Sequence, residues 1–226
     1  MVLLSGGMDS AVAAAWTRAR GHPWIALTVD YGQRHSAELA AAAEIARRLG
    51  AVETVRLAVD LRAVGGSALT GALDVPKGGA GGGGIPPTYV PARNTLLLAL
   101  GLGLAEARGA TLLVLGANRI DYSGYPDCRP AFLEAFQALA CVATKAGIEG
   151  RAPQLLAPLL HCSKAEIVRM GRSLGVPFEC TLSCYDPDLD GRACGACDSC
   201  RLRARGFSEA GLPDPAAPPE RGNRAN

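Results

Sequence analysis

A glycine-containing turn near the start of the chain places the tightest limit on its fold. The turn, Ser5–Ser10, follows the apolar stretch Met1–Leu4 and leads into the alanine-rich segment Ala11–Ala19. Two adjacent glycines allow the backbone to approach an anion closely, and the free N–H groups at the start of a helix favour negative charge. The pattern therefore predicts a strand, a phosphate-binding turn and a helix. A tight turn capped by Ser or Asp, with no ligand, is the alternative.

Strand-like runs alternate with helix-like segments along most of the remaining chain. The predicted strands are Trp24–Val29, Glu53–Val59 and Thr111–Ala117. The predicted helices are Ala37–Leu49, Asn94–Arg108, Pro130–Ala146 and a segment that runs from the capping box Ser163–Glu166 to about Leu174. This order predicts an α/β fold, a doubly wound parallel sheet with helices on both faces. Ligands of such folds bind at the carboxyl ends of the strands.

Three stretches break this alternation and define the predicted domains. Residues 1–177 form the α/β domain, apart from a flexible glycine-rich insert at about residues 63–88. Residues 178–205 hold five of the eight cysteines and predict a small metal-binding lobe. Residues 206–226 are rich in Pro, Gly and charged side chains, which predicts a disordered tail.

The composition limits the classes of function. The chain has 226 residues, a net charge of +2 and 5% aromatic residues, which argues against a dedicated nucleic-acid-binding surface. No apolar run reaches the roughly 18 residues that a membrane-spanning helix needs, and the first residues lack the basic start of a signal peptide. We therefore expect a soluble cytoplasmic protein with no membrane or direct nucleic-acid partner. The first strand begins at Met1, which leaves open a native start further upstream.

Nucleotide chemistry is the function that the turn favours. The turn contains no lysine, so it differs from the G-x-x-x-x-G-K-[ST] loop of ordinary nucleotide hydrolases. The string S-G-G-x-D-S instead resembles the loop of the ATP pyrophosphatases (the PP-loop superfamily), which cleave ATP between its α- and β-phosphates. This resemblance implies ATP and Mg²⁺ as cofactors, with Asp9 either orienting the loop or holding the metal ion. The candidate nucleotide-binding residues are Leu4, Ser5, Gly6, Gly7, Met8, Asp9, Ser10 and Asp30, and the candidate catalytic residues are Ser5, Asp9, Ser10 and Lys164.

Lys164 belongs to that set because of its position in the capping box. A lysine in the first turn of a helix opposes the helix dipole, so its presence there predicts a contact with phosphate. A solvated surface lysine is the alternative.

Three further segments narrow the choice among the families of ATP pyrophosphatases. They are D-Y-G-Q-R-H at Asp30–His35, V-P-A-R-N at Val90–Asn94 and D-Y-S-G-Y-P-D-C-R at Asp121–Arg129. Each alone is an ordinary loop, but together they resemble the 7-cyano-7-deazaguanine synthases of queuosine biosynthesis over about residues 1–205. All three segments should face the same edge of the sheet.

The resemblance implies a carbon–nitrogen ligase with small-molecule substrates. A first ATP adenylates 7-carboxy-7-deazaguanine, ammonia displaces AMP to give the amide, and a second ATP adenylates the amide, which then loses AMP to give the nitrile. Pyrophosphate leaves at each adenylation, and no ADP forms. The sequence shows no glutaminase domain, so free ammonia is the expected nitrogen source. An enzyme that stops at the amide remains open, and so does a homodimer.

A carboxylate suits the deazaguanine ring, because it accepts hydrogen bonds from N1–H and the exocyclic amino group together. Asp121 and Asp127 are the candidates, with Tyr122 or Tyr125 to stack on the base or to form a hydrogen bond. The alternative is that an aspartate only fixes the turn. Arg93 completes the candidate substrate-binding set.

Four cysteines in the pattern C-x₉-C-x₂-C-x₂-C predict a metal site. Cys184, Cys194, Cys197 and Cys200 offer four thiolates, which suit tetrahedral Zn²⁺. The metal would supply folding energy that such a short segment lacks. The spacing is also similar to that of iron–sulfur sites, but the family resemblance favours zinc. Cys180 could replace Cys184 as a ligand.

Two other functions remain as alternatives. A tRNA thiolase with an iron–sulfur cluster uses the same kind of loop, but the low net charge and the Asp121–Arg129 segment count against it. The second alternative is not an enzyme but a zinc-containing nucleic-acid-binding module with a degenerate nucleotide fold. The intact S-G-G-x-D-S string counts against that module.

Overall fold

A parallel sheet forms the centre of the molecule. The computed structural model describes residues 1–71, 73–78 and 84–217, with the backbone alone for residues 121–123. Within these residues the sheet has five strands in the order β3-β2-β1-β4-β5. Their bounds are β1 Val2–Leu3, β2 Ile25–Asp30, β3 Glu53–Ala58, β4 Leu112–Val114 and β5 Gln154–Leu156. Every pair of neighbours is parallel, so the predicted α/β class is confirmed.

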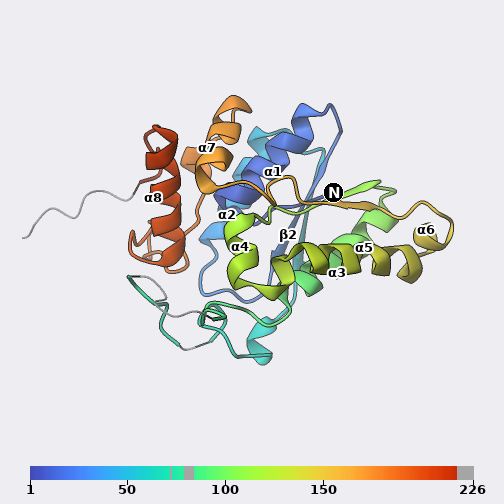
Figure 1. The fold of residues 1–226 in the computed structure, drawn as a ribbon, viewed down its shortest axis with the longest axis horizontal. Coiled ribbons are helices and arrows are strands. Elements are labelled where there is room, and N and C mark those ends of the chain that lie inside the picture. Colours follow the sequence, from blue (N-terminus) through green and yellow to red (C-terminus); the bar gives the residue numbers. More distant parts are fainter. Residues whose placement is uncertain (72, 79–83, 218–226) are drawn as a thin grey trace, which may run out of the picture.

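Helices cover both faces of this sheet (Figure 1). One face packs against α1 Met8–Ala19, α2 Ala37–Arg48 and α7 Lys164–Ser173, and the other packs against α3 Arg93–Ala107 and α5 Pro130–Ala143. The remaining helices are α4 Arg119–Gly124, α6 Lys145–Ile148 and α8 Asp198–Ala210, with 3-10 turns at Leu61–Ala63, Pro126–Cys128 and Phe178–Cys180. This arrangement is the doubly wound layering that the sequence predicted.

The first strand shows why the sheet needs two apolar layers. Val2 and Leu4 point into the core on the α1 side, whereas Leu3 points into the core on the α3 side. Successive side chains of a strand alternate between faces, so a strand that is buried on both sides must be apolar throughout. Even a two-residue strand can therefore occupy the centre of the sheet.

The position of β1 also fixes where a ligand can bind. The chain builds β2 and β3 on one side of β1 and then returns to build β4 and β5 on the other side. Loops after β1 and β4 therefore diverge to opposite faces, which leaves a crevice at their carboxyl ends. Gly116 keeps this crevice tight, because an ideal Cβ there would lie 2.9 Å from the backbone nitrogen of Ser10.

Two elements differ from the sequence prediction. Strand β5 was not predicted, because three residues at the end of a sheet carry too little pattern. Residues 206–210, which were assigned to the predicted tail, belong to α8, which continues to Ala210 and ends at Gly211, whose φ is 72°. Phe207 is only 3% exposed and contacts the ring of Phe178 edge-on, at a centroid distance of 5.1 Å.

The flanks of the predicted insert pack against the cysteine lobe. Leu61, Leu69, Val75 and Val90 form a third apolar cluster together with three of the lobe's cysteines. Lys77 pairs with Cys197 in an isolated antiparallel bridge, and the N–H of Gly78 donates to the carbonyl of Ala196 at 3.1 Å. Residues 79–83, the middle of the glycine run for which we predicted a mobile tip, lie outside the described residues.

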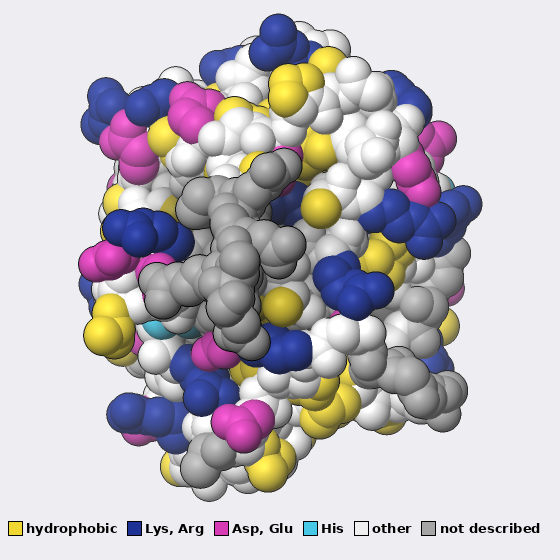
Figure 2. Space-filling view, turned by 90° about the vertical axis from the view of Figure 1, so that its left-hand side faces the viewer, with side chains coloured by type: hydrophobic (Ala, Val, Ile, Leu, Met, Phe, Trp, Pro, Cys, Tyr) yellow, Lys and Arg dark blue, Asp and Glu magenta, His cyan; other side chains and the backbone are white. Residues whose placement is uncertain are grey.

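Acidic and basic side chains are interspersed on the face of the molecule that includes α8. Figure 2 shows basic side chains there next to acidic ones, and the described residues of this face form no continuous basic surface. Ion pairs such as Arg205 with Glu209 account for part of this pattern. Of the helices that the structure describes, none is long and apolar enough to cross a membrane.

Candidate functional site

Two serine hydroxyls hold the loop after β1 in shape. The Oγ atoms of Ser5 and Ser10 lie 3.1 Å apart. Ser5 Oγ accepts from the N–H of Gly7 at 3.3 Å, and Ser10 Oγ donates to the carbonyl of Gly7 at 2.9 Å. The loop therefore leads directly into the N-terminus of α1 with its curvature set by its own side chains. An anion placed there meets both hydroxyls and the positive end of the helix dipole.

Gly6 is the residue that the loop geometry requires. Its φ is 89°, a conformation that only glycine adopts readily. An ideal Cβ at this position would lie 2.3 Å from the carbonyl oxygen of Glu38, in the first turn of α2. The loop can therefore pass this close to α2 only without a side chain.

Asp9 and Lys164 form an ion pair at the mouth of the loop. The Nζ of Lys164 donates to Oδ2 of Asp9 at 2.6 Å, and the two side chains are 11% and 24% exposed. This contact excludes the alternative of a solvated surface lysine. The other carboxylate oxygen of Asp9, Oδ1, is buried and accepts no hydrogen bond from the described residues. An unsatisfied buried oxygen beside a phosphate-type loop suits a bound cation or donor.

The segment before the first clustered cysteine holds the loop from the opposite side. The N–H of Leu182 donates to the carbonyl of Gly6 at 3.0 Å, and the N–H of Met8 donates to Oγ of Ser183 at 3.1 Å. Sequence reasoning missed Ser183, although it lies directly before Cys184 in the lobe. Its role could be found only from contacts between residues 175 positions apart.

One cavity brings the loop and the substrate segments together. Of the predicted site residues, those that line it are Leu4, Ser5, Gly7, Asp9, Ser10, Arg93 and Tyr125. Gly6 and Met8 belong to the loop but do not face the cavity, and Lys164 reaches the site through Asp9. The predicted substrate residues Asp121 and Tyr122 lie in α4, where the structure describes the backbone alone. The carboxyl edge of the sheet is therefore the place where these segments converge, as expected.

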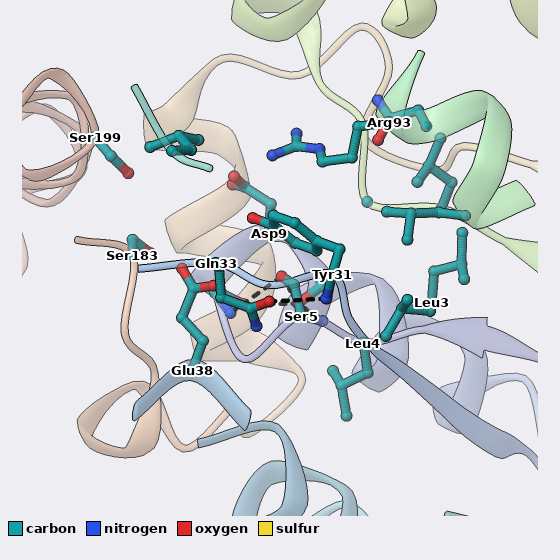
Figure 3. A pocket seen from close by; sticks show the side chains of 18 of the residues that line it. Leu3, Leu4, Ser5, Asp9, Tyr31, Gln33, Glu38, Arg93, Ser183 and Ser199 are labelled. Atoms are coloured by element: carbon teal, nitrogen blue, oxygen red, sulfur yellow. Dashed lines mark hydrogen bonds between the residues drawn. The ribbon is translucent and has the colours of Figure 1, made fainter. Parts of the chain in front are cut away.

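Several cavity residues were not among the predicted set. Figure 3 shows Glu38 of α2 and Arg93 of α3 entering the cavity from different sides, with Tyr31 between them. The guanidinium carbon of Arg93 lies 5.8 Å from the centroid of the Tyr31 ring. Gln33 accepts from the N–H of Tyr31 at 2.9 Å and so fixes the turn after β2. Both Tyr31 and Glu38 lie in or near the D-Y-G-Q-R-H segment, which was the available signal.

Asp30 has a different partner from the one predicted. Its carboxylate pairs with Arg56 of β3 at 2.5 Å, and it is not among the residues that line the cavity. The hydrogen bond from Arg56 is the main reason that the pKa of Asp30 is below its usual range. This ion pair links the ends of two neighbouring strands, and the contact of Asp30 with a nucleotide stays a prediction.

Asp127 makes contacts that suit the second of the two roles that the sequence left open, in which an aspartate fixes the turn. Its side chain is 6% exposed, and Oδ2 accepts from the backbone N–H of Asn94 at 2.9 Å. Asn94 lies in the first turn of α3, whose N–H groups lack partners within the helix. The side-chain amide of Asn94 in turn donates to the carbonyl of Asp127 at 3.2 Å. The aspartate therefore ties its loop to the start of α3.

Replacing Asp127 with alanine should lower the free energy of unfolding by about 1–3 kcal/mol, because it leaves a buried N–H without an acceptor. Asp127→Asn keeps an acceptor oxygen and is the matched control, which should lose less stability. Urea unfolding of both variants measures the difference. If Asp127→Ala is as stable as the parent but binds its substrate acid more weakly, the capping role is wrong and the residue reads the base.

Four cysteines of the lobe converge on one point. The sulfur atoms of Cys184, Cys194, Cys197 and Cys200 all lie within 4.8 Å of one another. Backbone N–H groups point at them, since Sγ of Cys184 accepts from Cys194 at 3.2 Å and from Asp186 at 3.3 Å. Cys180 lies apart in the α1-side core, and burial raises its pKa. The predicted set of four is therefore the group that fits a metal ion, and Cys180 does not replace Cys184.

The family model and the sequence relatives indicate the same family. The family model described as "Queuosine biosynthesis protein QueC" matches residues 1–211. A 7-cyano-7-deazaguanine synthase of Xanthomonas campestris pv. campestris (strain B100) is 59% identical over 215 residues, which is 95% of each chain. The corresponding protein of Anaeromyxobacter sp. (strain Fw109-5) is 60% identical over 219 residues, covering 95% of this chain and 94% of the relative. Among solved structures, an NMN synthetase from Francisella tularensis covers 94% of this chain and 76% of its own, with 17% identity and a TM-score of 0.47.

Proposed function

The chain belongs to the QueC family of queuosine biosynthesis proteins, and from this premise we propose that it is an ATP-dependent carbon–nitrogen ligase that makes 7-cyano-7-deazaguanine. Its substrates are 7-carboxy-7-deazaguanine and ammonia, and ATP is cleaved to AMP and pyrophosphate. The observation that carries this proposal is the identity of 59% over 95% of the chain to a 7-cyano-7-deazaguanine synthase. The cavity with the S-G-G-M-D-S loop at its base supports it independently.

The loop is suited to the group that leaves. When a carboxylate or amide oxygen attacks the α-phosphorus of ATP, negative charge grows on the departing pyrophosphate. Ser5 and the N-terminus of α1 supply donors at that place before the reaction starts, and Ser10 holds the loop in shape through the carbonyl of Gly7. Donors that need no rearrangement contribute most to stabilising such charge.

Asp9 and Lys164 complete the part of the cavity where the phosphates of ATP would bind. Lys164 is held at 2.6 Å from Asp9, where it can reach an oxygen of the nucleotide, and the buried Oδ1 of Asp9 is free to bind Mg²⁺. Magnesium prefers a few carboxylate oxygens together with phosphate oxygens, so one carboxylate beside the loop is the expected number. Mg²⁺ would neutralise charge on the phosphates of ATP.

The substrate side consists of Arg93, Tyr125 and the segment around α4. Arg93 lies across the cavity from the loop residues and can bind the carboxylate of the substrate as a cation. Since Asp127 is occupied with α3, Asp121 is the remaining predicted carboxylate for the N1–H and amino donors of the deazaguanine. Tyr122 and Tyr125 follow Asp121 closely in sequence.

Zinc is the metal that we propose for the cysteine lobe. Four thiolates with no open position are typical of structural Zn²⁺ sites, and the neighbouring N–H groups stabilise anionic sulfur. The cytoplasm keeps such thiols reduced and supplies ATP, so we place the enzyme there.

Product analysis tests the proposed function. Incubation of the protein with 7-carboxy-7-deazaguanine, ammonium and Mg-ATP should yield the nitrile, with two AMP and two pyrophosphate per product and no ADP, because the loop grips the β- and γ-phosphates as one group. Supplied amide should yield nitrile with one AMP. Mass spectrometry and nucleotide chromatography measure both ratios. Formation of ADP and orthophosphate would contradict the assignment, and accumulation of amide would show that the enzyme stops halfway.

A further inference from the structure

Glu38 is a cavity carboxylate that the reaction described so far does not use. It lies in the first turn of α2, and its backbone carbonyl is the atom that forbids a Cβ at Gly6. The backbone that carries this carboxylate is therefore in direct contact with the phosphate loop. Figure 3 shows its side chain directed into the cavity, toward Ser183.

This carboxylate has no fixed partner in the described part of the chain. The other acidic side chain in the cavity, Asp9, is paired with Lys164, and Asp30 outside it is paired with Arg56. Neither a hydrogen bond nor an ion pair links the carboxylate of Glu38 to another described residue, and the positive charge of Arg93 acts on it. A carboxylate kept unpaired next to the loop can change its protonation state during a reaction.

We propose that Glu38 is the base that takes protons from the nitrogen of the substrate during both halves of the reaction. This inference rests on the proposed function, which requires ammonia to lose protons as it becomes an amide and then a nitrile. No other described carboxylate of the cavity is available for that task.

In the first half, the nitrogen lone pair of ammonia attacks the carbonyl carbon of the acyl adenylate and forms the new C–N bond. The nitrogen then carries a positive charge, and one of its protons passes to a carboxylate oxygen of Glu38. The C–O bond to AMP breaks, and AMP leaves with that electron pair. The proton moves from Glu38 to solvent before the next turnover.

In the second half, the amide oxygen attacks the α-phosphorus of ATP and pyrophosphate leaves. The adenylated amide holds two N–H protons and one positive charge. Loss of one proton to solvent gives a neutral imidate, and loss of the second proton to Glu38, as the C–O bond to AMP breaks and AMP leaves with its electron pair, gives the nitrile. One carboxylate at one position can therefore serve both steps.

The surroundings of Glu38 suit a base that works near neutral pH. Burial raises the pKa of Glu38 to about 7, and the positive charge of Arg93 lowers it in part. Tyr31 stands beside it, and burial raises the pKa of that phenol, which keeps Tyr31 neutral. His35 also lines the cavity, but burial lowers its pKa, so it is a poorer proton acceptor. A base is most effective when its pKa lies close to the working pH.

The exchange of labelled pyrophosphate into ATP separates adenylation from the ammonia step. With the substrate acid present and ammonia absent, Glu38→Gln should exchange pyrophosphate at close to the parent rate, because adenylation needs no proton transfer from nitrogen. Nitrile formation with ammonia should fall roughly 100-fold or more. Glu38→Asp should retain an intermediate rate. Glu44→Gln, on the same helix but on the exposed side, is the matched control and should behave as the parent.

A pH profile at constant free ammonia adds a second measurement. A base works in its deprotonated form, so turnover of the parent should fall as the pH drops through about 7, and Glu38→Gln should lack this limb. Loss of pyrophosphate exchange in Glu38→Gln would overturn the proposal, because it would make Glu38 part of ATP or base binding. Unchanged nitrile formation would also overturn it. If the parent protein itself shows no exchange with this acid, the proposed function fails instead.

Discussion

A Gly6→Ala variant should turn over at least roughly 100-fold more slowly than the parent, because its loop cannot keep the position that the reaction needs. The new Cβ would lie 2.3 Å from the carbonyl oxygen of Glu38, which is backbone and cannot rotate away. The φ of 89° adds strain of about 1–3 kcal/mol for any residue with a side chain. Initial rates of AMP formation measure the effect.

A Gly50→Ala variant separates the effect of backbone strain from the effect of a clash between the new Cβ and its neighbours. Gly50 follows α2 with a φ of 71°, but an ideal Cβ there meets no atom within 4 Å. This control should lose stability by about 1 kcal/mol from the backbone conformation alone and keep its turnover. Equal losses of activity in both variants would show that backbone strain, and not the approach of the loop to α2, is responsible.

A Cys197→Ala variant should lose both its metal and its activity. Removing one of four thiolates opens the cysteine cluster that joins the two ends of residues 184–200, and such segments fold only with the metal bound. Activity should fall with it, since Leu182 and Ser183 would no longer be held against Gly6 and Met8. Metal analysis of the purified protein, together with AMP formation, measures the two losses, and the parent should hold about one zinc per chain.

Cys180→Ala is the matched control, because Cys180 lies in the α1-side core and not in the metal cluster. It should keep its metal and its turnover. A Cys197→Ala protein that stays folded and active would show that the lobe does not depend on the metal. Iron in place of zinc in the parent would favour the thiolase alternative.

The parts of the fold that the sequence predicted are those with strong local patterns. The turn after β1 was predicted because Ser, Gly and Asp in that order have few uses between a strand and a helix. The cysteine set was predicted because its spacing leaves few geometries. Helix α8 was missed because charged residues recur along it and because its few buried residues, such as Phe207 against Phe178, find their partners in distant segments.

The parts of the site that the sequence did not predict depend on contacts between distant segments. Asp127 looked equally suited to read a base or to fix a turn, and only its hydrogen bond with Asn94 favours the turn. Glu38 looked like an ordinary acidic residue in the first turn of a helix, where a carboxylate is stabilised by the dipole. Its place in the cavity follows from the close packing of α2 on Gly6, which no local pattern reports.

The N–H of Leu182 donates to the loop and Oγ of Ser183 accepts from it, and these two hydrogen bonds make nucleotide affinity and metal affinity one linked equilibrium. Coupling free energies between two binding sites are reciprocal. If the bound metal raises the affinity of the loop for a nucleotide, a bound nucleotide raises the affinity of the cysteines for the metal by the same factor. The affinity of the four thiolates for their metal ion therefore rises when ATP is abundant. In a cell short of ATP, the same protein would be the more readily stripped of its metal.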